Sequence, residues 1–181
     1  MKIATFNINN INRRLKNLID WLRAAKPDIV CLQELKCTDA ELPAAVLSEA
    51  GYDAVWRGER SWNGVAILAR WTPLVTRTAL SGDPADGQSR YIEAAVNGVL
   101  VASIYAPNGN PQPGPKFAYK LAWMEQLTAH AADLYATGAP IALAGDFNVA
   151  PTDLDIYKTQ SWDRDALLQP ESRAAYRRFL A

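Results

Sequence analysis

Ile141-Ala-Leu-Ala-Gly-Asp-Phe-Asn148 is the stretch that decides the fold. Four small or apolar residues followed by Gly145 predict a buried strand that runs into a turn. Side chains alternate along an extended chain, so we expect Asp146 and Asn148 on one side and Phe147 on the other. A carboxylate and an amide at a strand end can bind a metal ion or orient a water molecule. Taken alone, the two residues more often form an Asx turn, so the rest of the chain must decide.

The composition indicates a globular protein of one domain. The chain has 181 residues, of which 49% are hydrophobic and 21% are charged, values typical of a folded domain. Lys plus Arg and Asp plus Glu both number 19. The basic excess of many nucleic-acid binders is therefore absent, although a local basic stripe is compatible with this balance.

The sequence also indicates the compartment. No apolar run is long enough to span a bilayer, and the first residues lack a signal-peptide core, so we expect a cytoplasmic protein with no membrane partner. Cys31 and Cys37 are expected to be free thiols rather than a disulfide framework. Without a matching His/Cys cluster they do not predict a zinc site.

A strand–helix–strand unit is predicted at the start of the chain. Lys2–Phe6 reads as a strand, and Arg13–Ala25 has apolar residues at helical spacing, with Asn12 as the expected N-cap. Ile29–Leu32 is wholly apolar, which predicts a strand buried on both faces. In such a unit both strands end at one edge of the sheet, so we expect Asn7 and Glu34 to lie together there.

Short strands and further helices are predicted in the remainder. The expected strands are Tyr52–Arg57, Gly64–Ala69, Val75–Ala79, Tyr91–Val96 and Val99–Tyr105, and the expected helices are Glu41–Ala50, Lys116–Tyr135 and Glu171–Ala181. Asn97-Gly98 is a strong hairpin signal between two of the strands. The sequence therefore predicts an α/β fold with mixed sheets. His130, the only histidine, falls within a predicted helix and is given no role.

Polar side chains follow four of the predicted strands, and they are Asn7, Glu34, Tyr105, and Asp146 with Asn148. Each has an ordinary alternative as a turn residue, a solvated strand end or a core-edge aromatic. The α/β topology, however, gathers strand ends at one rim. Oxygen ligands of this kind suit Mg²⁺ or Mn²⁺ rather than zinc. A hard cation beside carboxylates and a tyrosine hydroxyl indicates phosphoryl chemistry.

Seven segments of the chain, taken together, resemble a known family. The segments that carry the resemblance are Ile3–Asn9, Pro27–Lys36, Asn63–Leu68, Arg90–Ala94, Tyr105–Gly109, Lys116-Phe117 and Gly145–Asp155. In this order they are similar to the exonuclease III family of apurinic/apyrimidinic (AP) endonucleases, in the endonuclease/exonuclease/phosphatase superfamily. Gln33-Glu-Leu-Lys36 and Ala150-Pro-Thr-Asp-Leu-Asp155 favour the DNA-repair branch over the lipid and inositol phosphatases.

The resemblance implies a role for each matching residue. Glu34 would be the principal Mg²⁺ ligand, with Mn²⁺ as an alternative ion, and Asn7, Asp146 and Asn148 would support the metal. Asp146 would also activate the attacking water, Asn148 would orient water or phosphate, and Tyr105 would contact the scissile phosphate or the leaving group. The residues that would bind the DNA substrate are Arg90, Lys116 and Asn108.

The implied fold is a four-layer α/β/β/α sandwich with two mixed β-sheets. Family members continue past the position of Ala181 into boxes that supply an Asp and a His. We therefore expect residues 1–181 to form a single domain that lacks its C-terminal part and has an incomplete second sheet. An exposed apolar patch and reduced catalysis would follow from such a truncation.

The implied function is Mg²⁺-dependent cleavage of double-stranded DNA at abasic sites, with 3′-to-5′ exonuclease and 3′-phosphatase capacity, by a monomeric enzyme of the exodeoxyribonuclease III type. One alternative is a phosphoesterase of the same superfamily that acts on small molecules or lipids. The other is an inactive remnant that only binds DNA or a partner. Preference between abasic sites and 3′ ends is open at this point, as is the number of metal ions.

Overall fold

The computed structural model of the chain describes residues 1–82, 86–157 and 162–181. These residues divide into two compact units, which are described separately below. The first unit comprises Met1–Tyr105 and Gly138–Asp146, and the second comprises Ala106–Thr137 and Phe147–Ala181. That residues 1–181 form a single domain stays a prediction.

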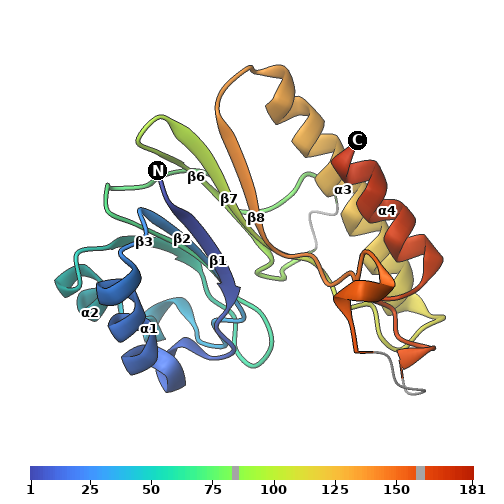
Figure 1. Cartoon of the computed structure of the whole chain (residues 1–181), viewed down its shortest axis with the longest axis horizontal. Helices are drawn as coiled ribbons and strands as arrows, with labels where there is room; N and C mark the ends of the chain where they lie inside the picture. Colours follow the sequence, from blue (N-terminus) through green and yellow to red (C-terminus); the bar gives the residue numbers. More distant parts are fainter. Residues whose placement is uncertain (83–85, 158–161) are drawn as a thin grey trace. The chain divides into compact units, whose positions relative to one another are not determined.

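The first unit contains two four-stranded sheets (Figure 1). One sheet has the order β1 (Ile3–Asn7), β2 (Ile29–Gln33), β4 (Val65–Ala69), β3 (Asp53–Arg57), and the other has the order β5 (Leu74–Arg77), β6 (Tyr91–Val96), β7 (Val99–Tyr105), β8 (Ile141–Asp146). In each sheet one pair is parallel, β1 with β2 and β7 with β8, and the remaining pairs are antiparallel. The prediction of an α/β fold with two mixed sheets is confirmed.

Apolar side chains of the two sheets form a common core. Its fully buried members include Ile29, Cys31, Val65, Ile67, Ile92 and Val101. Burial of each aliphatic side chain of this kind contributes about 1.5–3 kcal/mol to folding. Residues from both sheets thus share one buried apolar layer, which fixes how the strand ends of the first unit are arranged.

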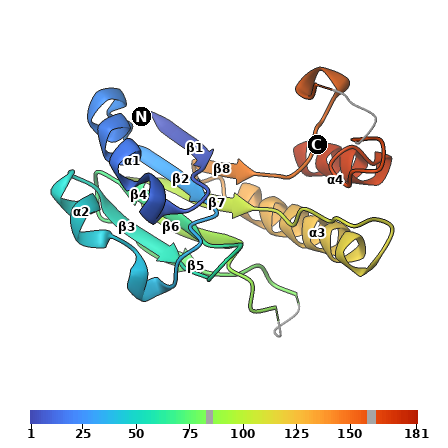
Figure 2. The ribbon, with the colours of Figure 1, turned by 90° about the horizontal axis from the view of Figure 1, so that it is seen from below.

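Two helices cover the other face of the first sheet (Figure 2). These are α1 (Ile11–Ala25) and α2 (Ala44–Glu49), and their buried Leu18, Leu22 and Leu47 belong to the same cluster as sheet residues Leu32 and Leu68. The first unit therefore has three layers, helices on a sheet on a second sheet.

The start of α1 differs from its prediction. Asn10, not Asn12, is the N-cap, and its side-chain oxygen accepts a hydrogen bond from the backbone N–H of Arg13 at 3.0 Å. The helix begins earlier because Ile11 is fully buried and contributes to the core. Asn tolerates the positive φ of 83° that the chain adopts at this cap.

The prediction for the second helix was also too long. Glu41–Ala50 is divided, with a 3-10 turn at Asp39–Glu41 and α2 at Ala44–Glu49. Pro43 occupies the N-cap position. Proline lacks a backbone N–H and restricts the preceding residue to extended conformations, so the helix cannot run through it.

Gly145 allows β8 to approach β7 closely. A Cβ atom built at this position would lie 2.0 Å from the carbonyl oxygen of Ile104. Gly145 is paired with Ile104, and the next pair along the strands is Asp146 with Tyr105. The absence of a side chain at residue 145 therefore sets the position of the carboxylate that follows it.

The second unit contains two packed helices, α3 (Pro115–Ala136) and α4 (Pro170–Leu180), which lie side by side in Figure 1. The ring of Phe147 contacts those of Tyr176 and Phe179, with centroids 5.4 and 5.3 Å away. That helices form an outer layer on the second sheet stays a prediction. In the described parts of the chain, every helix is too short or too polar to cross a bilayer.

Candidate active site

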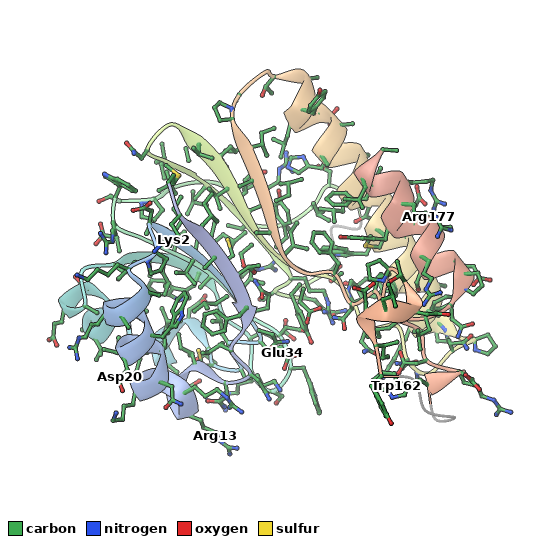
Figure 3. The ribbon with its side chains drawn as sticks, in the orientation of Figure 1. Lys2, Arg13, Asp20, Glu34, Trp162 and Arg177 are labelled. Carbon is green, nitrogen blue, oxygen red and sulfur yellow. The ribbon has the colours of Figure 1, made fainter. Side chains whose placement is uncertain are left out.

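Four of the predicted residues meet in the first unit. The amide nitrogen Nδ2 of Asn7 donates hydrogen bonds to Glu34 Oε1 at 2.7 Å and to Asp146 Oδ2 at 3.1 Å. The hydroxyl of Tyr105 donates to the same Glu34 Oε1 at 2.9 Å. Figure 3 shows Glu34 at the end of the first sheet toward which the β1 arrow points. Two carboxylates, an amide and a phenol thus share one hydrogen-bonded cluster.

The two parallel strand pairs explain why these residues meet. Asn7 is the last residue of β1 and is paired with Gln33 at the end of β2, immediately before Glu34. In the other sheet, Tyr105 ends β7 and is paired with Asp146 at the end of β8. Each sheet therefore contributes one pair of strand ends, as expected for parallel strands in α/β folds.

Glu34 itself adopts an unusual backbone conformation. Its φ is 55°, in the left-handed region that costs a non-glycine residue about 1–2 kcal/mol. Neighbouring segments fix this conformation, since Asn10 N donates to the Glu34 carbonyl at 2.8 Å and Leu35 N donates to the Gly64 carbonyl at 3.2 Å. Strained residues that are held in this way concentrate at functional sites.

Two further residues, Lys36 and Asn9, belong to the cluster. The sequence predicted no role for either. Lys36 Nζ lies 2.7 Å from Glu34 Oε2 and donates to Asn9 Oδ1 at 2.6 Å. The backbone N–H of Asn9 donates in turn to Asn7 Oδ1 at 3.0 Å. Strand alternation could not have found them, because β1 ends at Asn7, β2 ends at Gln33, and Asn9 and Lys36 both have positive φ.

The surroundings of Glu34 and Tyr105 shift the pKa values of both groups. Burial raises the pKa of Glu34, but hydrogen bonds from Lys36, Asn7 and Tyr105 and the charge of Lys36 outweigh it, so the pKa is lowered. Burial first, and then the hydrogen bond to Glu34, raise the pKa of Tyr105 well above its ordinary value. At neutral pH the cluster therefore has an ionised Glu34 beside a Tyr105 that keeps its proton.

Arg90 stacks on Tyr105. Its guanidinium carbon lies 5.0 Å from the centroid of the Tyr105 ring, and its Nη1 donates to the Tyr105 carbonyl at 3.3 Å. Its Nε donates to Gln88 Oε1 at 2.9 Å. In this position the guanidinium holds the ring whose hydroxyl contacts Glu34. The predicted contact of Arg90 with DNA stays a prediction.

The donor set fits a hard divalent cation. Glu34 and Asp146 supply carboxylate oxygens that accept from the same Asn7 amide nitrogen, and the Glu34 side chain is 18% exposed, so solvent reaches it. Among the described residues no group of three or more His, Cys, Asp or Glu side chains could hold a metal ion. Two carboxylates are ligands of the kind that hard divalent cations take, with water completing the coordination.

Asn7 is oriented to support the carboxylates. Its nitrogen faces Glu34 and Asp146, while its oxygen accepts the hydrogen bond from Asn9. In this orientation the amide holds both carboxylates in place. Direct binding of an ion by Asn7 would need its oxygen to turn toward them, and that role stays a prediction.

The other predicted site residues, Asn108, Lys116 and Asn148, belong to the second unit. The Asn108 side-chain oxygen accepts from the backbone of Asn110 at 3.1 Å, and Lys116 is exposed in the first turn of α3. Strand alternation does not extend to Asn148, because β8 ends at Asp146 and Asn148 has a φ of 50°. That part of the prediction was wrong. The Asn148 amide donates instead to the Ala106 carbonyl at 2.8 Å.

Comparisons with known proteins show similarity over nearly the whole chain. A family model described as the endonuclease/exonuclease/phosphatase family matches residues 4–179. The DNA repair nuclease APEX1 of Danio rerio is 30% identical over 185 residues, which cover 99% of this chain and 59% of that protein. The exodeoxyribonuclease III of Haemophilus influenzae is 32% identical over 189 residues, covering 98% of this chain and 71% of that protein. The chain thus spans about three fifths of the first relative.

A solved structure is similar over the same range. The 3′ phosphatase NExo from Neisseria, bound to a product DNA hairpin, has a TM-score of 0.93 at 38% identity, with 99% of this chain and 70% of that chain covered. The predicted resemblance is therefore confirmed, and so is the predicted enzyme type at the level of the family. With a family match over residues 4–179 and relatives that include an exodeoxyribonuclease III and a DNA repair nuclease, the chain belongs to the endonuclease/exonuclease/phosphatase family.

Proposed function

We propose that this chain carries the catalytic cluster of a Mg²⁺-dependent DNA-repair phosphodiesterase. Its activities would be cleavage at abasic sites in duplex DNA, 3′-to-5′ exonuclease activity and 3′-phosphatase activity. The observation that carries the proposal is the pair of carboxylates, Glu34 and Asp146, joined through the Asn7 amide beside the hydroxyl of Tyr105. Support comes from the family, whose nucleases depend on metal ions.

Glu34 and Asp146 would hold the ion, and Asn7 and Lys36 would fix the orientation of their carboxylates. Once bound, Mg²⁺ neutralises charge on phosphate oxygens and lowers the pKa of nearby water. Mn²⁺ suits the same oxygen ligands, so it is expected to replace Mg²⁺. Glu34 Oε1 accepts hydrogen bonds from both Asn7 and Tyr105. The ion would therefore bind to Oε2, which is paired with Lys36 in this structure.

Asp146 would take the proton from the attacking water, since its carboxylate lies beside the metal ligand Glu34 through Asn7. Tyr105 would act as a hydrogen-bond donor to a phosphate oxygen or to the leaving group, because its raised pKa keeps the phenol protonated. Asn148 would orient water or phosphate, and Asn108, Arg90 and Lys116 would bind the DNA backbone.

Two features of the relatives support DNA as the substrate. One relative is named a DNA repair nuclease, and the similar solved structure is a 3′ phosphatase with a product DNA hairpin. An abasic nucleotide has no base to unstack, so its extrusion from the duplex into an enzyme pocket costs little. We therefore expect action both at abasic sites and at blocked 3′ ends.

The proposal is tested with a duplex oligonucleotide that contains one abasic-site analogue and with a hairpin that ends in a 3′ phosphate. We expect cleavage of the first and phosphate release from the second, both in the presence of Mg²⁺ and neither after chelation. Glu34→Gln and Asp146→Asn should remove both activities. Asp20→Asn is the matched control, because Asp20 is exposed on α1 and pairs with Lys16.

Other outcomes favour the alternatives. Turnover of a small phosphate ester without cleavage of either DNA would support a phosphoesterase of different specificity. Metal-independent DNA binding without cleavage, unaffected by Glu34→Gln, would support a binding role alone.

A further inference from the structure

Lys120 is completely buried, with an exposed fraction of 0%, although it lies on α3 only four residues after exposed Lys116. A buried lysine amine costs free energy unless its N–H groups find acceptors. A leucine or methionine would fill the same interior at lower cost. The presence of an amine here therefore needs a reason other than packing.

This amine donates to two backbone carbonyls in separate segments of the second unit. Lys120 Nζ donates to the carbonyl of Asn108 at 3.1 Å and to the carbonyl of Asn148. The sequence separations are 12 and 28 residues. One side chain thus ties two segments that carry predicted site residues.

The chain around Asn108 is shaped to fit the stem of Lys120. Gly109 has a φ of 92°, and a Cβ atom there would lie 2.7 Å from Cδ of Lys120 and 3.1 Å from Cβ of Ala166. Only glycine fits this approach without a shift. The same turn is held further along, where Asn110 Oδ1 accepts from the backbone of Ala166 at 2.9 Å.

The segment around Asn148 is held as well. Its backbone turns into the left-handed region, with a φ of 50°, which asparagine tolerates, and its side-chain amide donates to the carbonyl of Ala106 at 2.8 Å. The carbonyl of Asn148 is bound by Lys120 at the same time. Backbone and side chain of Asn148 are therefore fixed from two directions.

We propose that Lys120 is a positioning residue that clamps the backbone at Asn108 to the backbone at Asn148 and so fixes the direction of both asparagine side chains. The catalytic consequence rests on the proposed function, which gives Asn148 the orientation of water or phosphate and Asn108 a contact with substrate. The clamp itself is a property of the second unit and can be measured without any reaction.

The test uses the full chain, labelled with ¹⁵N, as wild type, Lys120→Met and Lys120→Arg. Arg177→Gln is the matched control, because it removes an exposed cation from α4 of the same unit (Figure 3). The first readout is the hydrogen-exchange protection of the Asn148 side-chain amide, which is bonded to Ala106. We expect Lys120→Met to lower this protection by about tenfold or more, and Arg177→Gln to leave it unchanged.

The second readout separates positioning from simple loss of structure. In cleavage of the abasic duplex, Lys120→Met should lower kcat by about 10- to 100-fold while KM changes by less than about threefold, because misplaced groups act on the transition state. Lys120→Arg, which can still donate to both carbonyls, should retain the amide protection and most of kcat.

Wild-type protection of the Asn148 amide in Lys120→Met would overturn the proposal. So would a folded Lys120→Arg chain that has lost the protection, and this variant decides the question if Lys120→Met does not fold. If the wild-type chain fails to cleave DNA, the proposed function fails, while the exchange measurement still decides whether Lys120 is the clamp.

Discussion

Glu34 and Lys36, two residues apart in the chain, form an ion pair of 2.7 Å in which the side chains are 18% and 20% exposed. The carboxylate that we assign to the metal thus has a resident counter-ion on its second oxygen. Such a pair keeps Glu34 ionised and in place before an ion arrives. It also means that an arriving cation must share this oxygen with Lys36 or displace it.

Lys36→Met should raise the pKa of Glu34. Burial raises this pKa, and the substitution removes the hydrogen bond and the charge of Lys36 that lower it. The pKa is lowered in the folded chain, so Glu34 contributes its full stabilisation above the ordinary value of about 4.3 and loses it as the pH falls through the folded pKa. In Lys36→Met this contribution should be smaller, and its loss should be complete at a higher pH. The measurements are the ¹³C carboxyl titration of Glu34 and urea unfolding across the acid range. Lys16→Met, which removes an exposed pair with Asp20, should leave the Glu34 titration unchanged.

Mg²⁺ should stabilise the folded chain. At a free concentration ten times the dissociation constant, the free energy of unfolding should rise by about 1.4 kcal/mol. Glu34→Gln and Asp146→Asn should each remove most of this increase, since each deletes a carboxylate of the proposed site. Thermal unfolding with and without Mg²⁺ measures the effect. An equal rise in Glu34→Gln and in the control Asp20→Asn would exclude Glu34 as a principal ligand.

Tyr105→Phe should retain the stacked Arg90 but lose the hydrogen bond to Glu34. Tyr52→Phe is a matched change, because the Tyr52 hydroxyl donates to the Pro27 carbonyl at 2.7 Å, away from the cluster. Each should lower the free energy of unfolding by about 0.5–1.5 kcal/mol. Only Tyr105→Phe should also lower DNA cleavage, and equal cleavage by the two variants would argue against a role for the Tyr105 hydroxyl.

Cys31 and Cys37 should react very slowly with thiol reagents in the native state. Burial raises the pKa of Cys31 to about 12, and burial together with the charges of Glu41 and Asp39 raises that of Cys37 to about 11. Little thiolate is therefore present at pH 8, and the sulfurs are inaccessible. A disulfide-exchange reagent should label both residues only after unfolding. Rapid labelling of the folded chain at either position would contradict the described burial.

Local sequence signals predicted part of the fold well. The Asn97-Gly98 turn, with φ of 46° and 81°, fixed the bounds of β6 and β7 at the predicted residues. The helix starts were less predictable. At α1 the N-cap is Asn10 and not the predicted Asn12, two positions earlier, because Ile11 is buried. Such boundaries depend on tertiary burial, which a local pattern does not contain.

The candidate site was likewise predicted in part from local sequence signals. Strand ends predicted the cluster of Asn7, Glu34, Tyr105 and Asp146, because parallel strands bring their ends to one edge. The role of Lys36 escaped prediction, since it depends on backbone turns with positive φ at Glu34 and Lys36 that reverse the expected alternation. The clamp by Lys120 escaped as well, because a lysine on a helix is ordinarily solvated.

Gly145 has a consequence for how this sequence can vary. Any other amino acid would place a carbon atom against the backbone oxygen of Ile104, which no change of rotamer can relieve. Whether a replacement of Gly145 is tolerated therefore does not depend on the chemistry of the new side chain. In a saturation-mutagenesis library selected for the proposed cleavage of DNA, polar, apolar and charged replacements of Gly145 should be lost to the same extent, whereas at exposed Lys116 the surviving replacements should be mainly basic.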